Sequence, residues 1–211
     1  MPLYFCSMAR LFAGILLFLG LHAYGQTQKN VQEYIARYQE VAIREMEQFG
    51  IPASVKMGQG IIESAAGTSE LAIQARNHFG IKCKKDWAGE TYTYDDDAKG
   101  ECFRKYDSAI RSFEDHSRFL KGNARYADLF QLDPRDYKGW AYGLKKAGYA
   151  TNPNYAQQLI KAIEDYRLYE LDTAPGDSRQ IPAQDEAKKP VEKKQDVPAN
   201  RGPDLEDFTA G

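Results

Sequence analysis

Histidine and cysteine are scarce in this sequence, and their scarcity limits the chemistry open to the protein. Three residues of each type occur among 211. No two cysteines form a CxxC pair, and His22, His78 and His116 do not lie at metal-ligand spacing from them. We therefore expect neither a metal site nor a redox centre, and nothing in the sequence implies an organic cofactor.

The motifs of several other functional classes are absent as well. There is no glycine-rich phosphate loop, no internal repeat and no alternation of strands with helices, so nothing supports nucleotide chemistry. No Ser-His-Asp or Cys-His elbow indicates acyl transfer. A formal net charge of −2 does not suggest the basic face that a nucleic-acid partner requires.

The first 25 residues are typical of a signal peptide. A short basic segment ends at Arg10, an apolar run covers residues 11–21, and Ala23 and Gly25 place small residues at the −3 and −1 positions of a cleavage site. The apolar run is short for a bilayer span, and a retained anchor is the alternative. We expect an exported protein, periplasmic or secreted, with no stable membrane insertion after cleavage.

Composition divides the rest of the chain into two parts. Residues 172–211 are rich in Pro, Asp, Lys, Gln and Ala and poor in aromatic residues, which predicts a disordered C-terminal tail. Residues 28–171 remain for a single folded domain, a length that buries one hydrophobic core.

Hydrophobic periodicity predicts that this domain is mostly helical. Between Trp87 and Tyr106 the sequence is instead rich in Thr, Tyr and Asp and predicts a two-stranded ribbon with an acidic turn at 95–100. Cys83 and Cys102 flank this ribbon and predict a disulfide at its base, worth about 3 kcal/mol. The predicted helices cover residues 31–49, 51–67, 69–75, 108–122, 137–147 and 154–168.

Glu63 is the candidate general acid. It lies near the end of an otherwise apolar helix, between two isoleucines and a Ser-Ala-Ala segment. A carboxylate half-buried among apolar groups loses hydration, so its pKa rises toward neutrality, as a general acid working near pH 7 requires. A solvent-facing helical glutamate is the alternative interpretation.

Three longer motifs carry a family resemblance. GIIESAAGTSELA followed by NHFGIK resembles the catalytic helix of the glucosaminidase domain of glycoside hydrolase family 73, and Gln59 and Ser64 match it beside Glu63. The segments FRKYDSAIRSFEDHSRFL and AGYATNPNYAQQLI resemble two further parts of that domain. The resemblance covers about residues 31–170, with Asn152 where the family usually has Asp.

The resemblance implies a lysozyme-like α+β fold, with a mostly helical lobe, a small inserted β-hairpin lobe and a substrate groove between them. It also implies an endo-β-N-acetylglucosaminidase that cleaves the β-1,4 bond between N-acetylglucosamine and N-acetylmuramic acid in peptidoglycan glycan strands. Glu63 would protonate the leaving oxygen. The alternatives are a muramidase, lytic transglycosylase or amidase on the same fold, or a non-catalytic wall-binding module. No protein partner is indicated.

In the family a second carboxylate comes from the ribbon, where this chain offers Asp95, Asp96, Asp97 and Glu101. The choice among them stays open, and a solvated acidic turn without a catalytic part is the alternative. Aromatic rings stack on the apolar faces of sugars, although Phe79 also fits the core. The candidate substrate-binding residues are Gln59, Ser64, Phe79, Trp87, Tyr149 and Tyr155.

Overall fold

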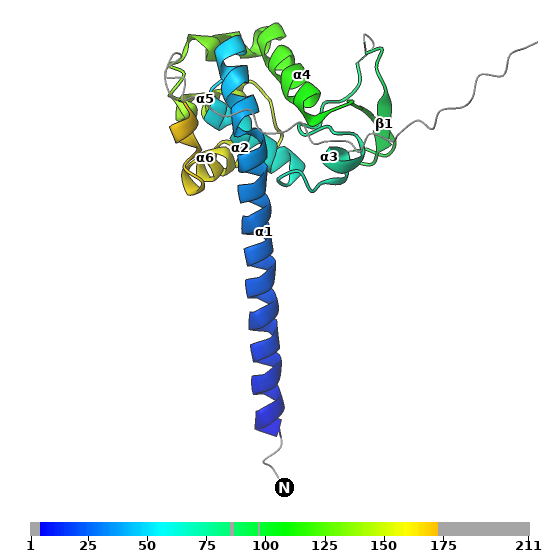
Figure 1. Cartoon of the computed structure of the whole chain (residues 1–211), viewed down its shortest axis with the longest axis vertical. Coiled ribbons are helices and arrows are strands. Elements are labelled where there is room, and N and C mark those ends of the chain that lie inside the picture. Colours follow the sequence, from blue (N-terminus) through cyan, green and yellow to red (C-terminus); the bar gives the residue numbers. More distant parts are fainter. Residues whose placement is uncertain (1–4, 85–86, 97, 173–211) are drawn as a thin grey trace, which may run out of the picture. The chain divides into compact units, whose positions relative to one another are not determined.

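The computed structural model describes residues 5–84, 87–96 and 98–172, and for residues 5–25 the course of the backbone alone. Within these ranges the chain is mostly helical and contains one two-stranded antiparallel sheet (Figure 1). Of the predicted tail at 172–211, residues 173–211 lie outside the described residues. The expected fold class, a lysozyme-like α+β domain, is confirmed by this architecture and by the structural comparisons given below.

The first helix, α1, covers Phe5–Phe49 and is longer than predicted. Residues 31–49 form its C-terminal part, where Val31, Tyr34 and Met46 are buried, and the predicted stop at Gly50 has a φ of 78°. No proline separates this part from the preceding residues, so the helix is continuous. The signal peptide at 1–25 stays a prediction. Among the described residues, no helix combines the length and apolarity that a bilayer span requires.

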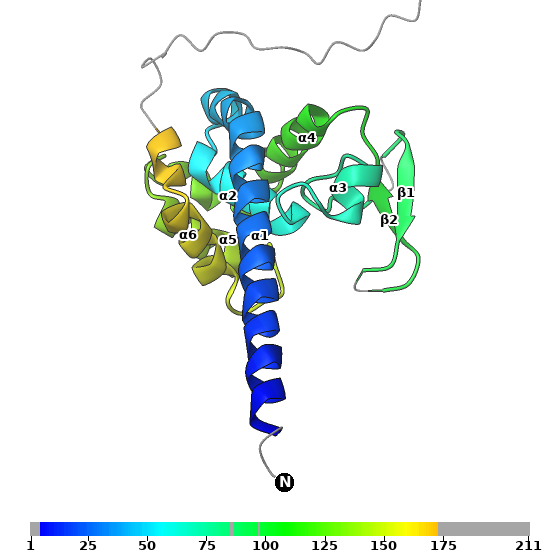
Figure 2. The same ribbon diagram turned by 60° about the horizontal axis from the view of Figure 1, so that its bottom comes forward.

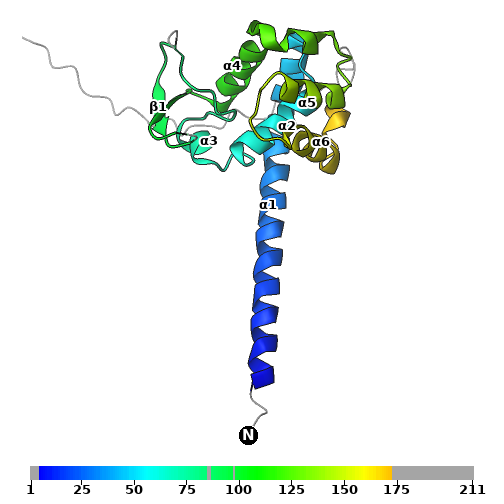
Figure 3. The same ribbon diagram turned by 180° about the vertical axis from the view of Figure 1, so that it is seen from behind.

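Helix α2, Ala53–Ser64, lies at the centre of the domain and packs against α1, α5, α6 and the 3₁₀ helix η2 (Figure 3). Pro52 precedes its first turn, as predicted, where a missing N–H costs nothing. Most of the helix is buried, including residues on opposite faces. Any polar side chain on α2 therefore needs a partner within the protein.

The hairpin lobe follows a short helix, α3, Glu70–Gln74, whose N-cap Ser69 accepts a hydrogen bond from the Ala72 backbone. Strands β1, Thr91–Tyr94, and β2, Glu101–Arg104, pair antiparallel, which confirms the predicted ribbon. Figure 2 shows the hairpin beside α3 and at the end of α4.

A disulfide joins Cys83 and Cys102, as predicted. It does not close the base of the ribbon. Lys82 forms a β-bridge with Phe103, and the Cys83 amide donates to the Cys102 carbonyl at 2.8 Å, so the segment around Cys83 lies along the edge of β2 opposite β1. The disulfide therefore fastens the ribbon to the chain that leads into it.

The remaining helices confirm the predicted ones with small changes in bounds. They are α4, Ala109–Gly122, α5, Tyr137–Lys146, and α6, Tyr155–Asp165, followed by η2, Leu168–Leu171. A 3₁₀ helix at Ala124–Gln131, η1, was not predicted. Asp172, the last described residue, is buried although it belongs to the predicted tail.

Candidate active site

A cleft of about 780 Å³ brings together residues from both lobes. Its walls come from the end of α2, the segment 79–84, the β1–β2 turn, α4 and the segment that joins α5 to α6. The predicted catalytic and substrate-binding residues that line it are Glu63, Phe79, Asp96, Tyr149 and Tyr155. This is the groove between helical lobe and ribbon that the resemblance implied.

Glu63 occupies the last turn of α2 with its side chain partly buried in this cleft. Burial raises its pKa from an ordinary value near 4.5 to about 7, a hydrogen bond with Tyr155 opposes this shift, and the charge of Asp96 adds to it. Its Oε1 atom is buried without a hydrogen-bond partner among the described residues. The carboxyl group is therefore protonated up to neutral pH.

Tyr155 connects Glu63 to the interior of the domain. Gln59 lies one turn before Glu63 on α2, is fully buried, and donates from Nε2 to the Tyr155 hydroxyl at 3.0 Å. Because Tyr155 accepts from Gln59, its own proton is directed to Glu63. Gln59 thus lies behind the cleft and connects to it through Tyr155.

The three described ribbon carboxylates have different surroundings. Asp95 accepts a hydrogen bond from the Gly100 amide at 2.7 Å and holds the turn. Glu101 forms an ion pair with Lys82 at 2.7 Å. Of these three, Asp96 alone lines the cleft, and its charge reaches Glu63. Asp97 lies outside the described residues.

Ser64 is fully buried and does not line the cleft. Its hydroxyl donates to the Gly60 carbonyl at 2.5 Å and accepts from the Gly67 amide at 2.8 Å. Ala65 follows in the left-handed conformation, with φ 49°. These bonds of Ser64 fix the C-terminal end of α2, so that Glu63 lies in its last turn, at the cleft.

Two buried polar residues that were not selected from the sequence lie at the cleft: His116 lines it, and Lys56 lies behind His116. Lys56 is fully buried on α2, and its Nζ lies 2.7 Å from Nδ1 of His116 on α4. His116 Nε2 lies 2.9 Å from the Tyr149 hydroxyl. A signal for Lys56 exists in the sequence: Lys56, Gln59 and Glu63 follow a three- and four-residue spacing, which places them on one face of α2.

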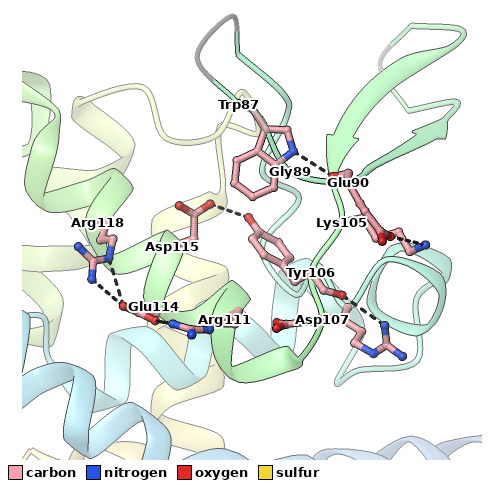
Figure 4. Close-up of a pocket in the computed structure, with 11 residues that line it drawn as sticks. Trp87, Gly89, Glu90, Lys105, Tyr106, Asp107, Arg111, Glu114, Asp115 and Arg118 are labelled. Carbon is pink, nitrogen blue, oxygen red and sulfur yellow. Dashed lines mark hydrogen bonds and ion pairs between the residues drawn. The ribbon is translucent and has the colours of Figure 1, made fainter. Parts of the chain in front are cut away.

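Trp87 does not line the Glu63 cleft. It lies instead in a second cavity, of about 820 Å³, between α4 and the segments around residues 89 and 106 (Figure 4). Its indole Nε1 donates to the Glu90 carbonyl at 2.9 Å, and the Arg104 guanidinium lies 4.6 Å from its ring. Trp87 therefore shapes the hairpin lobe rather than the wall beside Glu63.

This second cavity is the larger of the two, but its charged groups neutralise one another. Glu114 pairs with Arg111 and Arg118 at 2.8 and 2.6 Å, and both arginines lower the pKa of Glu114. Asp115 accepts from Arg104 and from the Tyr106 hydroxyl at 2.9 and 2.6 Å (Figure 4). Glu114, which the two arginines hold ionised, is not available as an acid near pH 7, so the Glu63 cleft is the better candidate.

Metal binding has no structural support in the described part of the chain, where no group of three or more His, Cys, Asp or Glu side chains is placed to hold an ion. The cleft itself presents the Glu63 carboxyl, the Asp96 carboxylate and the ring of Tyr149. These functional groups are the ones that acid-assisted cleavage of a glycosidic bond requires.

Comparison with known proteins agrees with this chemistry. The family described as mannosyl-glycoprotein endo-beta-N-acetylglucosaminidase matches residues 39–168. The exo-glucosaminidase LytG of Bacillus subtilis is 34% identical over 135 residues, 60% of this chain and 48% of LytG. The peptidoglycan hydrolase FlgJ of Pseudomonas aeruginosa is 29% identical over 159 residues, 70% of this chain and 40% of FlgJ. The chain thus spans about half or less of the length of these relatives.

Solved structures extend the likeness to the fold. The catalytic domain of the autolysin Auto from Listeria monocytogenes superposes with a TM-score of 0.59 at 27% identity, covering 67% of this chain and 87% of that domain. The glycoside hydrolase domain of Salmonella typhimurium FlgJ superposes with a TM-score of 0.56 at 28% identity, covering 66% of this chain and 90% of that domain.

Proposed function

Because this chain belongs to the glucosaminidase family, glycoside hydrolase family 73, we propose that it is an exported endo-β-N-acetylglucosaminidase acting on peptidoglycan. It cleaves the β-1,4 bond between N-acetylglucosamine and N-acetylmuramic acid, and Glu63 is the general acid. The observation that carries this proposal is the half-buried Glu63 carboxyl, with a pKa raised to about 7, in a cleft that Asp96 shares.

Glu63 protonates the glycosidic oxygen as the bond breaks, because an alkoxide is a poor leaving group. The protonated state is available below about pH 7 because burial penalises the carboxylate. Asp96 supplies the second carboxylate of the cleft, where it stabilises the positive charge that develops on the sugar or activates water. The ring of Tyr149 offers an apolar face and a hydroxyl to the sugar, while the Tyr155 hydroxyl is bonded to Gln59 and Glu63.

Lysis of purified peptidoglycan tests the catalytic assignment. Glu63→Gln keeps the size and the polarity of the side chain but removes the acid, so turbidity clearance should fall at least about a hundredfold. The control is Glu47→Gln, because Glu47 is an exposed residue of α1. Unchanged clearance by Glu63→Gln would remove Glu63 from the mechanism. Wall binding without clearance by the unaltered protein would favour the binding module instead.

Export is tested separately, by fractionating cells that make the protein and sequencing its N-terminus. The proposal predicts a mature chain that begins at Gln26, recovered outside the cytoplasm. A chain that retains residues 1–25 and stays with the membrane fraction would identify an anchor instead.

A further inference from the structure

Lys56 is a fully buried lysine whose ammonium group has three partners, all on α4. Its Nζ lies 3.3 Å from the Phe113 carbonyl, 2.7 Å from the Ser117 hydroxyl and 2.7 Å from His116 Nδ1. Burial lowers the pKa of Lys56 to about 7, so below this pH the side chain is an ammonium group, which has three N–H donors and no acceptor. The three contacts use all of them, so Nδ1 of His116 accepts from Lys56.

This contact fixes the tautomer of His116. Burial lowers the pKa of His116 well below its ordinary range, so the ring is neutral and carries one N–H. Because Nδ1 accepts from Lys56, the hydrogen lies on Nε2. The ring is also held in place by Phe79, which stacks on it at 4.1 Å between centroids with an interplanar angle of 10°.

The His116 tautomer in turn sets the direction of the Tyr149 hydroxyl. His116 Nε2 donates to the Tyr149 oxygen over 2.9 Å, so the phenol accepts on its inner side and its own proton points elsewhere. Tyr149 lines the cleft that contains Glu63, and burial keeps the phenol protonated by raising its pKa. The free O–H is therefore a hydrogen-bond donor toward the cleft.

We propose that Lys56 and His116 are positioning residues that hold the Tyr149 hydroxyl as a hydrogen-bond donor to the N-acetylated sugar bound beside Glu63. The identity of the ligand as a sugar depends on the proposed function. The order of donors from Lys56 through His116 to Tyr149 does not depend on it. Burying a lysine costs free energy because its charge loses hydration. A role in positioning Tyr149 through His116 accounts for a lysine at this buried place.

Nitrogen NMR of the histidine rings tests the order of donors without any substrate. We expect the His116 ring at pH 6 to be neutral with hydrogen on Nε2, and Lys56→Met to give a mixture of tautomers. The His116 signals are identified by their loss in His116→Gln. Hydrogen on Nδ1, or a mixture in the unaltered protein, would overturn the proposal even if the enzyme is a glucosaminidase.

A double-mutant cycle tests whether His116 acts through Tyr149. His116→Phe keeps the stacking on Phe79 and removes both nitrogens, and Tyr149→Phe removes the hydroxyl. Each should lower kcat on soluble peptidoglycan fragments about tenfold or more with little change in KM. The doubly substituted protein should be no slower than Tyr149→Phe. Losses that multiply would contradict the proposal, because His116 would then act independently of the hydroxyl.

Two further variants separate positioning from general stability. His116→Gln places an amide donor near the Nε2 position and should recover part of the kcat that His116→Phe loses. The matched control is His78→Phe, because His78 Nδ1 also contacts a tyrosine hydroxyl, that of Tyr34 at 3.0 Å, in a buried position outside the cleft. If His78→Phe lowers kcat as much as His116→Phe, positioning is refuted. No products from the unaltered enzyme would refute the proposed function and leave the NMR result standing.

Discussion

Asp172 is hydrogen-bonded to the first turn of α2, although 118 residues separate it from its partner Ser54. Its carboxylate accepts from the Ser54 amide at 2.8 Å and from the Ser54 hydroxyl at 2.5 Å. The first amides of a helix have no partner within the helix, so a carboxylate at this end satisfies them and interacts favourably with the helix dipole. The end of the described chain therefore fixes the start of the helix that carries Glu63.

Asp172→Ala should lower the free energy of unfolding by about 1 to 3 kcal/mol, because it leaves the buried Ser54 donors without an acceptor. Urea denaturation measures the change. Asp128→Ala, at an exposed position of η1, is the control and should change the free energy by less than about 0.5 kcal/mol. Equal effects of the two substitutions would mean that the contact does not stabilise α2.

Glu63 should make the protein less stable as pH rises. Its pKa is about 7 in the folded state against an ordinary 4.5, so the folded protein holds a proton that the unfolded chain loses, and stability falls between these values. The penalty reaches about 3 kcal/mol above pH 7. Glu63→Gln should therefore leave stability unchanged near pH 4 and raise it by up to about 3 kcal/mol at pH 8.

Denaturation of both proteins at the two pH values measures this difference, with Glu47→Gln as the exposed control. A gain that is the same at pH 4 and pH 8 would show that the Glu63 carboxyl is not perturbed.

The same pKa sets the upper limit of activity. Protonated Glu63 is the acid, so kcat should decline about tenfold per pH unit above pH 7. Burial lowers the pKa of Lys56 to about 7 as well, so the profile is repeated with Lys56→Met. The decline should persist in that variant. Its disappearance there would assign the pH limit to Lys56 instead of Glu63.

Asp96 should be the most important of the described ribbon carboxylates. Asp96→Asn is expected to lower kcat about a hundredfold or more, because Asp96 lines the cleft. Asp95→Asn and Glu101→Gln should cost less than about tenfold, since these residues bond the turn and Lys82. Asp97→Asn completes the series. The prediction fails if any of these three substitutions costs more than Asp96→Asn.

Loss of the disulfide should affect both stability and the cleft. Cys83 and Cys102 are 19 residues apart, so replacing both by serine should lower the unfolding free energy by about 3 kcal/mol. Because Cys83 lines the cleft, KM should also rise. A reducing agent should bring the unaltered protein to the level of the variant and leave the variant unchanged. A reducing agent without effect on the unaltered protein would contradict this account.

The sequence predicts the helical part of the fold well because periodicity reports burial directly. The unpredicted 3₁₀ helix at Ala124–Gln131 has 8 residues, which is shorter than the window of about 11 to 18 residues over which helical periodicity is recognised. Asp172 falls where composition changes, yet its contact with Ser54 is set by tertiary packing that composition does not report.

Site residues could be predicted where their sequence neighbours alone make them unusual, and not where tertiary packing brings distant residues together. Glu63 stands out because a carboxylate in an apolar helix is unusual. Trp87 was predicted to bind substrate and lines the second cavity instead of the Glu63 cleft, because the sequence does not report on which side of the ribbon a ring lies. Lys56 and His116 lie 60 residues apart, and their contact appears only when α2 packs near α4.

The most direct test of the central claim is mass spectrometry of borohydride-reduced products after the protein has digested purified peptidoglycan, alongside Glu63→Gln. The account predicts reduced N-acetylglucosamine ends from the unaltered protein and none above background from Glu63→Gln. Reduced muramic acid ends would contradict it in favour of a muramidase, and anhydro ends in favour of a lytic transglycosylase. Released peptides on intact glycan strands would identify an amidase.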